Sequence, residues 1–177
     1  MSRIGKGYVQ IYTGNGKGKT TAALGLALRA AGHGLKSIMI QFMKGQHYCE
    51  LESAEKLGGL ITIEQFGHPQ FCRFTDPPDA ADVKRAQAAL MRIREIIFAK
   101  ACDVLIIDEA TTAVIFNLIK ESDLLGIIKD KPSGMELVMT GRGATPALIE
   151  AADLVTEMQD IKHYYNKGVQ ARKGIES

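Results

Sequence analysis

The chain has 177 residues and a mass of 19.3 kDa, which suits a single domain over residues 1–177 rather than two. Hydrophobic residues make up 46% and charged residues 24%, which is ordinary globular usage and argues against a disordered chain. The formal net charge is +2, so charge alone points to neither a nucleic-acid-binding protein nor a membrane-surface protein.

The first predicted elements are a strand, a glycine-rich turn and a helix. Residues 8–12 (YVQIY) are β-branched and aromatic, as in a strand, and they run into Thr13 and Gly14. Residues 19–31 are rich in Ala and Leu, which predicts a helix, and Gly32 follows as its C-cap. Three more elements are predicted next: a strand at 37–43, a helix at 51–57 and a strand at 60–66.

The second half continues the alternation of strands and helices. Residues 79–100 carry apolar side chains at three- and four-residue steps, which predicts a long amphipathic helix. Residues 104–107 (VLII) form a continuous apolar run, typical of a strand buried on both faces of a parallel sheet. The remaining predicted elements are a strand at 137–139, a helix at 147–151 and a strand at 154–155. This order predicts an α/β domain whose mostly parallel sheet is covered by helices on both faces.

The cysteines and the apolar segments indicate the cellular compartment in which the protein is expected. Cys49, Cys72 and Cys102 are odd in number and lack CxxC spacing, so they fit neither a disulfide framework nor a cysteine-rich zinc site. Reduced thiols in a cytoplasmic protein are the expectation. The first seven residues contain no apolar signal segment, and no apolar run approaches the ~20 residues of a membrane span. The sequence therefore predicts a soluble, cytoplasmic protein without a membrane partner.

The turn after the first strand has the composition of a phosphate-binding loop. Its sequence, TGNGKGKTT over residues 13–21, stands between a predicted strand and a predicted helix, as a P-loop requires. Three glycines let backbone N–H groups point at an anion, and the helix N-terminus adds positive potential. Lys19 is predicted to contact phosphates, and the Thr20 hydroxyl is predicted to ligate Mg²⁺. The candidate ligand-binding residues of the loop are Gly14, Asn15, Gly16, Lys17, Gly18, Lys19, Thr20 and Thr21.

The loop departs from the usual spacing GxxxxGK[ST]. Counted from Gly14 it is one residue short, and aligned by length it has Thr13 in place of the first glycine. The alternative is a turn rich in Gly and Lys that only caps a helix. The flanking elements and an acidic pair downstream favour the phosphate loop.

That acidic pair, Asp108 and Glu109, closes the apolar run at 104–107. If this strand is a parallel neighbour of the first strand, the two carboxylates lie near Thr20 and can hold a metal directly or through water. Side chains alternate along a strand, so one of the two is expected to be the direct ligand. On composition alone, the alternative is a solvated turn.

These motifs together resemble the ATP:cob(I)alamin adenosyltransferases of the CobA/CobO type. The resemblance extends over nearly the whole chain, and the short phosphate loop combined with the Thr-Gly-Arg-Gly block is its most specific part. The matching blocks are residues 13–21 with Arg29, Gln41-Phe42, Lys44-Gly45, Asp108-Glu109 with Thr111, residues 140–143 (TGRG), Lys162-His163, Gly168-Val169 and Gly174-Ile175.

The resemblance implies a three-layer α/β/α P-loop domain of RecA-like type that transfers the 5′-deoxyadenosyl group of ATP to the Co(I) of a reduced corrinoid. Inorganic triphosphate is the implied leaving group, and ATP is implied to lie reversed relative to other P-loop proteins. Because Co(I) is a nucleophile without a proton, no general base is needed, and the protein supplies alignment and charge neutralisation. A homodimer, Mg²⁺ and a flavoprotein reductant are also implied.

The resemblance also implies residue roles. It places Gly14 to Thr20 on the triphosphate, with Thr20 and Glu109 on Mg²⁺, so that Lys19, Thr20 and Glu109 carry the reaction. Arg29 matches a family position near the phosphates, and its alternative is an ordinary surface arginine. Arg142 stands where a loop can meet substrate, and an exposed turn residue is the alternative.

Two departures from the family concern the corrinoid. Family members often carry an N-terminal helical extension that covers the corrinoid, whereas only seven residues precede Tyr8, so a lid is expected from elsewhere. The family also places a Phe and a Trp after the third strand, where they help to remove the lower axial ligand of cobalt. This chain has no Trp, and Phe71 or Phe74 would take that role unless both are local core anchors. His68 is interpreted as a turn residue rather than a cobalt ligand.

Two other functions stay open from the residues alone. A P-loop ATPase or small-molecule kinase would use Glu109 to activate water or a hydroxyl and would release ADP. A non-enzymatic ATP sensor or corrinoid carrier would bind nucleotide without turnover.

Overall fold

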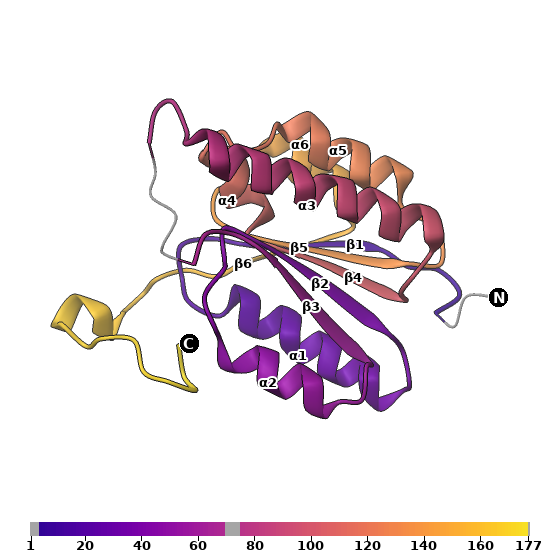
Figure 1. Cartoon of the computed structure of the whole chain (residues 1–177), viewed down its shortest axis with the longest axis horizontal. Coiled ribbons are helices and arrows are strands. Elements are labelled where there is room, and N and C mark those ends of the chain that lie inside the picture. Colours follow the sequence, from indigo (N-terminus) through magenta and orange to yellow (C-terminus); the bar gives the residue numbers. More distant parts are fainter. Residues whose placement is uncertain (1–3, 70–74, 177) are drawn as a thin grey trace.

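Six parallel strands form one sheet with helices on both faces (Figure 1). The structure, a computed structural model, describes residues 4–69 and 75–176. The strand order is β3-β2-β4-β5-β1-β6. The strands are β1 (Val9–Thr13), β2 (Ser37–Phe42), β3 (Ile61–Phe66), β4 (Val104–Asp108), β5 (Glu136–Thr140) and β6 (Leu154–Glu157). The predicted parallel α/β domain is therefore confirmed.

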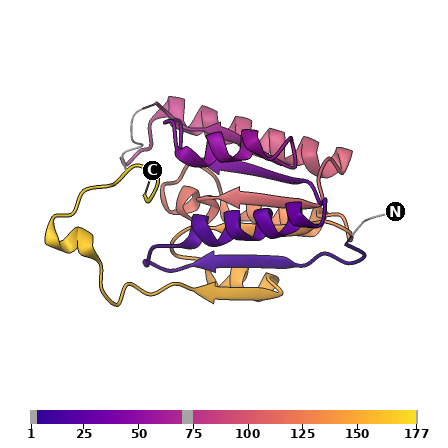
Figure 2. The ribbon, with the colours of Figure 1, turned by 90° about the horizontal axis from the view of Figure 1, so that it is seen from below.

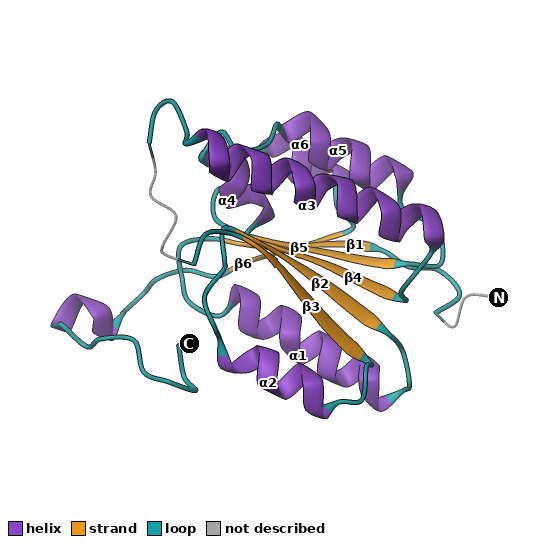
Figure 3. Cartoon of the chain, viewed as in Figure 1, coloured by secondary structure: helices purple, strands orange, loops and turns teal. Residues whose placement is uncertain are grey.

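Helices lie in two layers, which Figure 3 shows in purple on either side of the strands. One face carries α1 (Lys19–Gly32) and α2 (Cys49–Lys56); the other carries α3 (Ala80–Ala99), α4 (Ala110–Ile115), α5 (Glu121–Asp130) and α6 (Pro146–Ala151). A 3₁₀ turn, η1 (Tyr164–Lys167), lies in the C-terminal segment. Within the described residues, no helix combines the length and the apolar character needed to cross a membrane.

The sheet separates two apolar cores. The larger core lies under α3 to α6 and includes Phe42, Leu90 and Leu105, which are 0% exposed. The smaller core joins Met39 and Ile106, on the opposite face, to the alanines of α1. Strand β4 is buried over its whole length because both faces of the central sheet are covered.

Helices α4 and α5 have no counterpart among the elements predicted from the sequence. Helix α4 is six residues long and contains two threonines, so its pattern is too short to distinguish from a turn. Helix α5 begins after Lys120 and ends before Pro132, and its buried Leu124 and Ile127 extend the larger core. Both helices lie between β4 and β5 in the chain and complete the crossover between them.

The strand order determines where α1 lies. Strand β4 is not a neighbour of β1, contrary to the condition set from the sequence, because β5 lies between them. Since β5 and β4 separate β1 from β2, the helix that joins β1 to β2 must cross beneath both, and α1 packs against β4 and β5. This crossing brings the N-terminus of α1 to the carboxyl end of β4.

Candidate active site

The glycine-rich loop lies at the carboxyl ends of the strands, which is where open parallel sheets bind ligands. Figure 2 shows the strand arrows pointing toward the end of the molecule where the C-terminal segment also lies. Helix α1 begins directly after Gly18, whose φ of 120° suits glycine and which has no side chain to cap the first turn. No acidic residue occupies that turn, so the positive helix terminus is not neutralised locally. This end of α1 is suited to bind an anion.

Lys19 anchors the interior of the loop. Its Nζ donates hydrogen bonds to the carbonyl oxygens of Gly14, at 2.7 Å, and Gly16, at 2.8 Å. The residue is 8% exposed, and burial lowers the pKa of Lys19 below its ordinary value, partly offset by the charge of Glu109. The charged ammonium, held among backbone carbonyls at the floor of the loop, is stabilised electrostatically when an anion binds beside it.

Asp108, at the end of β4, is fully buried and accepts four hydrogen bonds. Its Oδ1 accepts from the hydroxyls of Thr20, at 2.8 Å, and Thr140, at 2.6 Å. Its Oδ2 accepts from Nζ of Lys44, at 2.8 Å, and from Nε2 of Gln41, at 3.2 Å. The prediction that this carboxylate lies near Thr20 is confirmed, through the crossing of α1 rather than through pairing of β1 with β4. Since all four of its acceptor positions are used, Asp108 orients its neighbours.

Glu109 has a different environment from Asp108. Its backbone is left-handed, with φ 58°, so a turn rather than the alternation of a strand separates the two carboxylates. Its backbone N–H donates to Thr140 Oγ1 at 3.0 Å, its side chain accepts from Thr112 Oγ1 at 2.5 Å, and it lines a cavity beside the loop. Of the acidic pair, Glu109 is the carboxylate that reaches the cavity.

The donor set suits a magnesium ion. The Thr20 hydroxyl donates its proton to Asp108, which leaves the oxygen lone pairs for another partner. Glu109 adds a carboxylate on the cavity wall. Mg²⁺ prefers oxygen ligands and commonly takes one or two protein groups together with substrate phosphates, so these residues fit such an ion.

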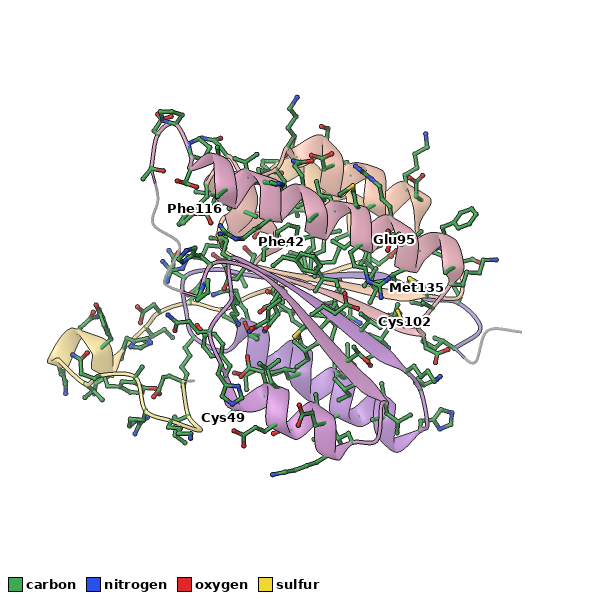
Figure 4. All side chains as sticks on the ribbon, in the orientation of Figure 1. Phe42, Cys49, Glu95, Cys102, Phe116 and Met135 are labelled. Carbon is green, nitrogen blue, oxygen red and sulfur yellow. The ribbon has the colours of Figure 1, made fainter. Side chains whose placement is uncertain are left out.

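The cavity beside the loop has a volume of about 540 Å³ and draws on distant parts of the chain. Tyr48, Cys49, Glu50 and Ser53 contribute from the start of α2, and Figure 4 shows Cys49 at that position. The predicted site residues that line it are Asn15, Gly16, Lys17, Gly18, Lys19, Thr20, Thr21, Glu109 and Arg142. The cavity thus brings together most of the phosphate loop and the two downstream motifs.

The C-terminal segment forms one wall of this cavity. The backbone of Met158 pairs with the loop, since Met158 N–H donates to Thr13 O at 2.8 Å and its carbonyl accepts from Gly16 N–H at 2.7 Å. A Cβ on Gly16 would lie 2.7 Å from the carbonyl oxygen of Gln159, so this close approach requires glycine. Further along, His163 and Glu176 also line the cavity.

Lys17 holds the end of that segment. Its Nζ lies 3.1 Å from Glu176 Oε1 and 3.1 Å from the hydroxyl of Tyr164. Arg172 pairs with the same carboxylate at 3.0 Å. Lys17 therefore contacts a protein anion at the cavity mouth, rather than pointing into the loop with Lys19.

The predicted residues outside the phosphate loop and the acidic pair differ in whether they line the cavity. Arg29 is exposed in the last turn of α1, ten residues and roughly 15 Å along the helix from Lys19, and it does not line the cavity. Arg142 lines the cavity and is exposed, with its backbone N–H bonded to Thr112 Oγ1 at 3.0 Å. Phe71 and Phe74 lie outside the described residues.

Three contributors were not identified from the sequence: Gln41, Lys44 and Thr140. All three belong to blocks that carry the family resemblance, but no role was assigned to any of them. All three lie at or just beyond the carboxyl end of a parallel strand, and such strand ends converge at one edge of the sheet. That convergence is the signal that could have grouped them with Asp108.

A second, larger hollow of about 1070 Å³ lies at the amino ends of β4 and β5, around Cys102 and Met135. Figure 4 shows these two residues at the opposite end of the sheet from Cys49. It contains none of the motif residues, and burial raises the pKa of Cys102 to about 12, which keeps the thiol protonated. The smaller cavity at the phosphate loop is therefore the candidate active site.

Solved structures with a similar fold include P-loop proteins. A KaiC-like protein from Pyrococcus horikoshii is 18% identical, with a TM-score of 0.56 over 89% of this chain and 74% of that chain. The flagellar accessory protein FlaH from Methanocaldococcus jannaschii is 13% identical, with a TM-score of 0.59 over 87% of this chain and 72% of its own. At these identities the likeness supports the RecA-like P-loop fold alone.

Several proteins share more sequence identity with this chain than these two solved structures do. A corrinoid adenosyltransferase from Sinorhizobium sp is 35% identical over 97% of this chain and 80% of its own length. The corrinoid adenosyltransferase of Pseudomonas aeruginosa is 31% identical over 99% of this chain and 86% of its own, and the Salmonella typhimurium enzyme CobA is 31% identical over 97% and 86%. Residues 5–177 match the family described as ATP:corrinoid adenosyltransferase BtuR/CobO/CobP. With the phosphate loop, the acidic strand end and the fold in agreement, the chain belongs to the ATP:corrinoid adenosyltransferase family.

Proposed function

We propose that the cavity at the phosphate loop binds the triphosphate of ATP and presents the 5′-carbon to the Co(I) of a reduced corrinoid. The observation that carries this proposal is the uncapped start of α1, where Lys19, Thr20 and Glu109 line one cavity. In this reaction the cobalt electron pair forms the Co–C bond as the bond from the 5′-carbon to the triphosphate oxygen breaks. The electron pair of that bond leaves with inorganic triphosphate.

The protein's task in this step is to stabilise the leaving group. Lys19 and the first backbone N–H groups of α1 neutralise the charge that develops on the triphosphate oxygen. Arg142 adds a cation from the loop after β5. No described residue is required to remove a proton, because Co(I) carries none.

We also propose Mg²⁺ as the metal of this site, held by Thr20 and Glu109. When bound, the ion would screen the phosphate charges and orient the triphosphate. Asp108 holds the Thr20 hydroxyl in the orientation that this requires, through the 2.8 Å hydrogen bond between them. Asp108 is thus a positioning residue rather than a direct ligand.

The acceptor is proposed to be cob(I)yrinic acid a,c-diamide or cob(I)alamin, in the biosynthesis or salvage of adenosylcobalamin. A flavoprotein is the proposed source of the electron that makes Co(I), in a cytoplasmic homodimer. The match of residues 5–177 to the ATP:corrinoid adenosyltransferase family supports this scheme.

Product analysis tests the proposal. The protein is incubated with ATP, Mg²⁺ and chemically reduced cobalamin, and the phosphorus products and the corrinoid spectrum are recorded. We expect inorganic triphosphate and an alkylated corrinoid in equal amounts. ADP with unchanged corrinoid would instead identify an ATPase or kinase, and nucleotide binding without turnover would identify a sensor or carrier.

A further inference from the structure

Lys44 lines the cavity and contacts Asp108. Its Nζ lies 2.8 Å from Asp108 Oδ2, 4.0 Å from Glu50 Oε1 and 5.2 Å from the ring centroid of Tyr48. Its side chain is 17% exposed and lines the cavity together with Lys19 and Thr20. The ammonium is thus partly buried at the mouth of an anion-binding loop.

The backbone around Lys44 is built to hold this position. Met43 has a left-handed backbone, with φ 59°, which is uncommon for a residue with a long side chain. A Cβ on Gly45 would lie 2.5 Å from the carbonyl oxygen of Gly67, and a Cβ on Gly67 would lie 2.3 Å from the carbonyl carbon of Met43. The loop after β2 is therefore packed backbone to backbone against the loop after β3, with little freedom to shift.

Two opposing effects, burial and the neighbouring Asp108, determine the charge on Lys44. Burial alone would lower the pKa of Lys44, but the charge and hydrogen bond of Asp108 outweigh burial and hold that pKa above its ordinary value. Lys44 is therefore a cation at neutral pH. Asp108 keeps three other donors, from Thr20, Thr140 and Gln41, so it stays hydrogen-bonded if the ammonium turns toward another anion.

We propose that Lys44 is a binding residue for the polyphosphate: its ammonium pairs with Asp108 in the free protein and contacts the triphosphate of bound ATP. Lys19 then neutralises the triphosphate from within the loop, and Lys44 neutralises it from the wall formed by the loop after β2. This role deepens the proposed function and rests on the triphosphate lying in the same cavity.

Nucleotide affinity measured by calorimetry, without corrinoid, tests the assignment. Lys44→Met keeps the apolar stem and removes the charge, Lys44→Arg keeps a cation, and Lys129→Met is the matched control on the exposed surface of α5. We expect Lys44→Met to bind ATP roughly tenfold more weakly and AMP almost unchanged, because a charge-assisted contact to the outer phosphates is lost. Lys129→Met should bind both nucleotides as the wild type does, and Lys44→Arg, which keeps a cation, should recover most of the ATP affinity that Lys44→Met loses.

Unchanged ATP affinity in Lys44→Met, or an equal loss for ATP and AMP, would overturn the role of Lys44. The proposed function is tested separately by Lys19→Ala: if that variant also binds ATP normally, the triphosphate lies elsewhere and both proposals fail. If it binds ATP weakly while Lys44→Met does not, only the role of Lys44 fails.

Removing Lys44 alone leaves Asp108 buried without its cation, which can prevent folding. The pair Asp108→Asn and Asp108→Asn/Lys44→Met contains no unpaired carboxylate in either variant. Both variants carry the same loss of Asp108 hydrogen bonds, so their nucleotide affinities are compared on the same background. We expect the double variant to discriminate ATP from AMP roughly tenfold less than the single variant. Equal discrimination in the two variants would overturn the role of Lys44.

Discussion

The hydroxyl of Thr20 donates a 2.8 Å hydrogen bond to Asp108 Oδ1, across 88 positions of the chain. This contact connects the start of α1 to the end of β4, although β5 lies between β1 and β4 in the sheet. It exists because α1 must cross beneath β5 and β4 on its way to β2. The two halves of the proposed triphosphate and metal site are therefore joined by the topology of the sheet.

Replacing Asp108 by Asn should lower the stability of the protein as well as its adenosylation activity. An amide has one acceptor oxygen and two donors where four donors now converge, and it leaves Lys44 without its buried partner. We expect a loss of about 3 kcal/mol in the free energy of unfolding, measured by urea denaturation. Glu109→Gln is the comparison, because Glu109 is half-buried and faces the cavity. It should reduce adenosylation with little change in stability, so similar denaturation curves for the two variants would contradict the different roles assigned to them.

Lys19→Ala should reduce the rate of adenosylation by a factor on the order of 100 or more, because a preorganised cation is lost from the leaving group. Its hydrogen bonds go to Gly14 and Gly16 within the loop, so the cores on either side of the sheet should remain intact. Steady-state kinetics with reduced cobalamin, together with circular dichroism, measures both effects. Lys129→Ala, on exposed α5, is the control. A wild-type rate in Lys19→Ala would remove Lys19 from the mechanism.

Glu176→Gln should release the C-terminal segment from the phosphate loop. The carboxylate pairs with Lys17 and Arg172, and the hydrogen bonds from Arg172 and then Tyr164 hold the pKa of Glu176 well below its ordinary value. The contacts are therefore present at neutral pH and are lost only as the pH falls into the acid range where the carboxylate gains a proton. Hydrogen exchange should be faster over residues 160–176 in the variant at pH 7, while Glu150→Gln, an exposed change on α6, should leave it unchanged. Equal exchange in both variants would show that other contacts hold the segment.

Cys49 and Cys102 should differ in reactivity and in their response to nucleotide. Cys49 lines the candidate active site, whereas Cys102 is buried at the other end of the sheet with its pKa raised to about 12. At pH 8 the Cys102 thiol is protonated and should stay unmodified by iodoacetamide until the protein unfolds. Peptide mapping by mass spectrometry should show that ATP slows modification of Cys49. Labelling of Cys49 at the same rate with and without ATP would place the nucleotide outside this cavity.

Local sequence patterns were sufficient for the phosphate loop and most of the sheet. The loop at 13–21 was identifiable because three glycines, a lysine and a hydroxyl stand between a β-branched strand and an alanine-rich helix. The parallel sheet followed from the alternation of elements, and the pairing of β4 between β2 and β5 agrees with its uninterrupted apolar run. The six-residue helix α4 was missed because it is too short for its periodicity to be read.

The surroundings of Asp108 could not be predicted in the same way. Its partners Gln41, Lys44 and Thr140 come from the ends of β2 and β5, and their convergence depends on the strand order rather than on local spacing. The C-terminal wall of the cavity could not be predicted either. Met158 contacts the loop through backbone atoms, and backbone contacts do not depend on the identity of the side chain. The sequence was sufficient to predict the chemistry of the phosphate loop, but not the tertiary contacts that the loop makes.

A crystal structure of the protein with ATP and Mg²⁺ tests the central claim most directly. We predict that the triphosphate lies against the main-chain amides at the start of α1, beside Lys19, with the metal near Thr20 and Glu109 and the 5′-carbon facing open space for the corrinoid. A triphosphate bound away from this loop, for instance in the hollow around Cys102, would contradict the account.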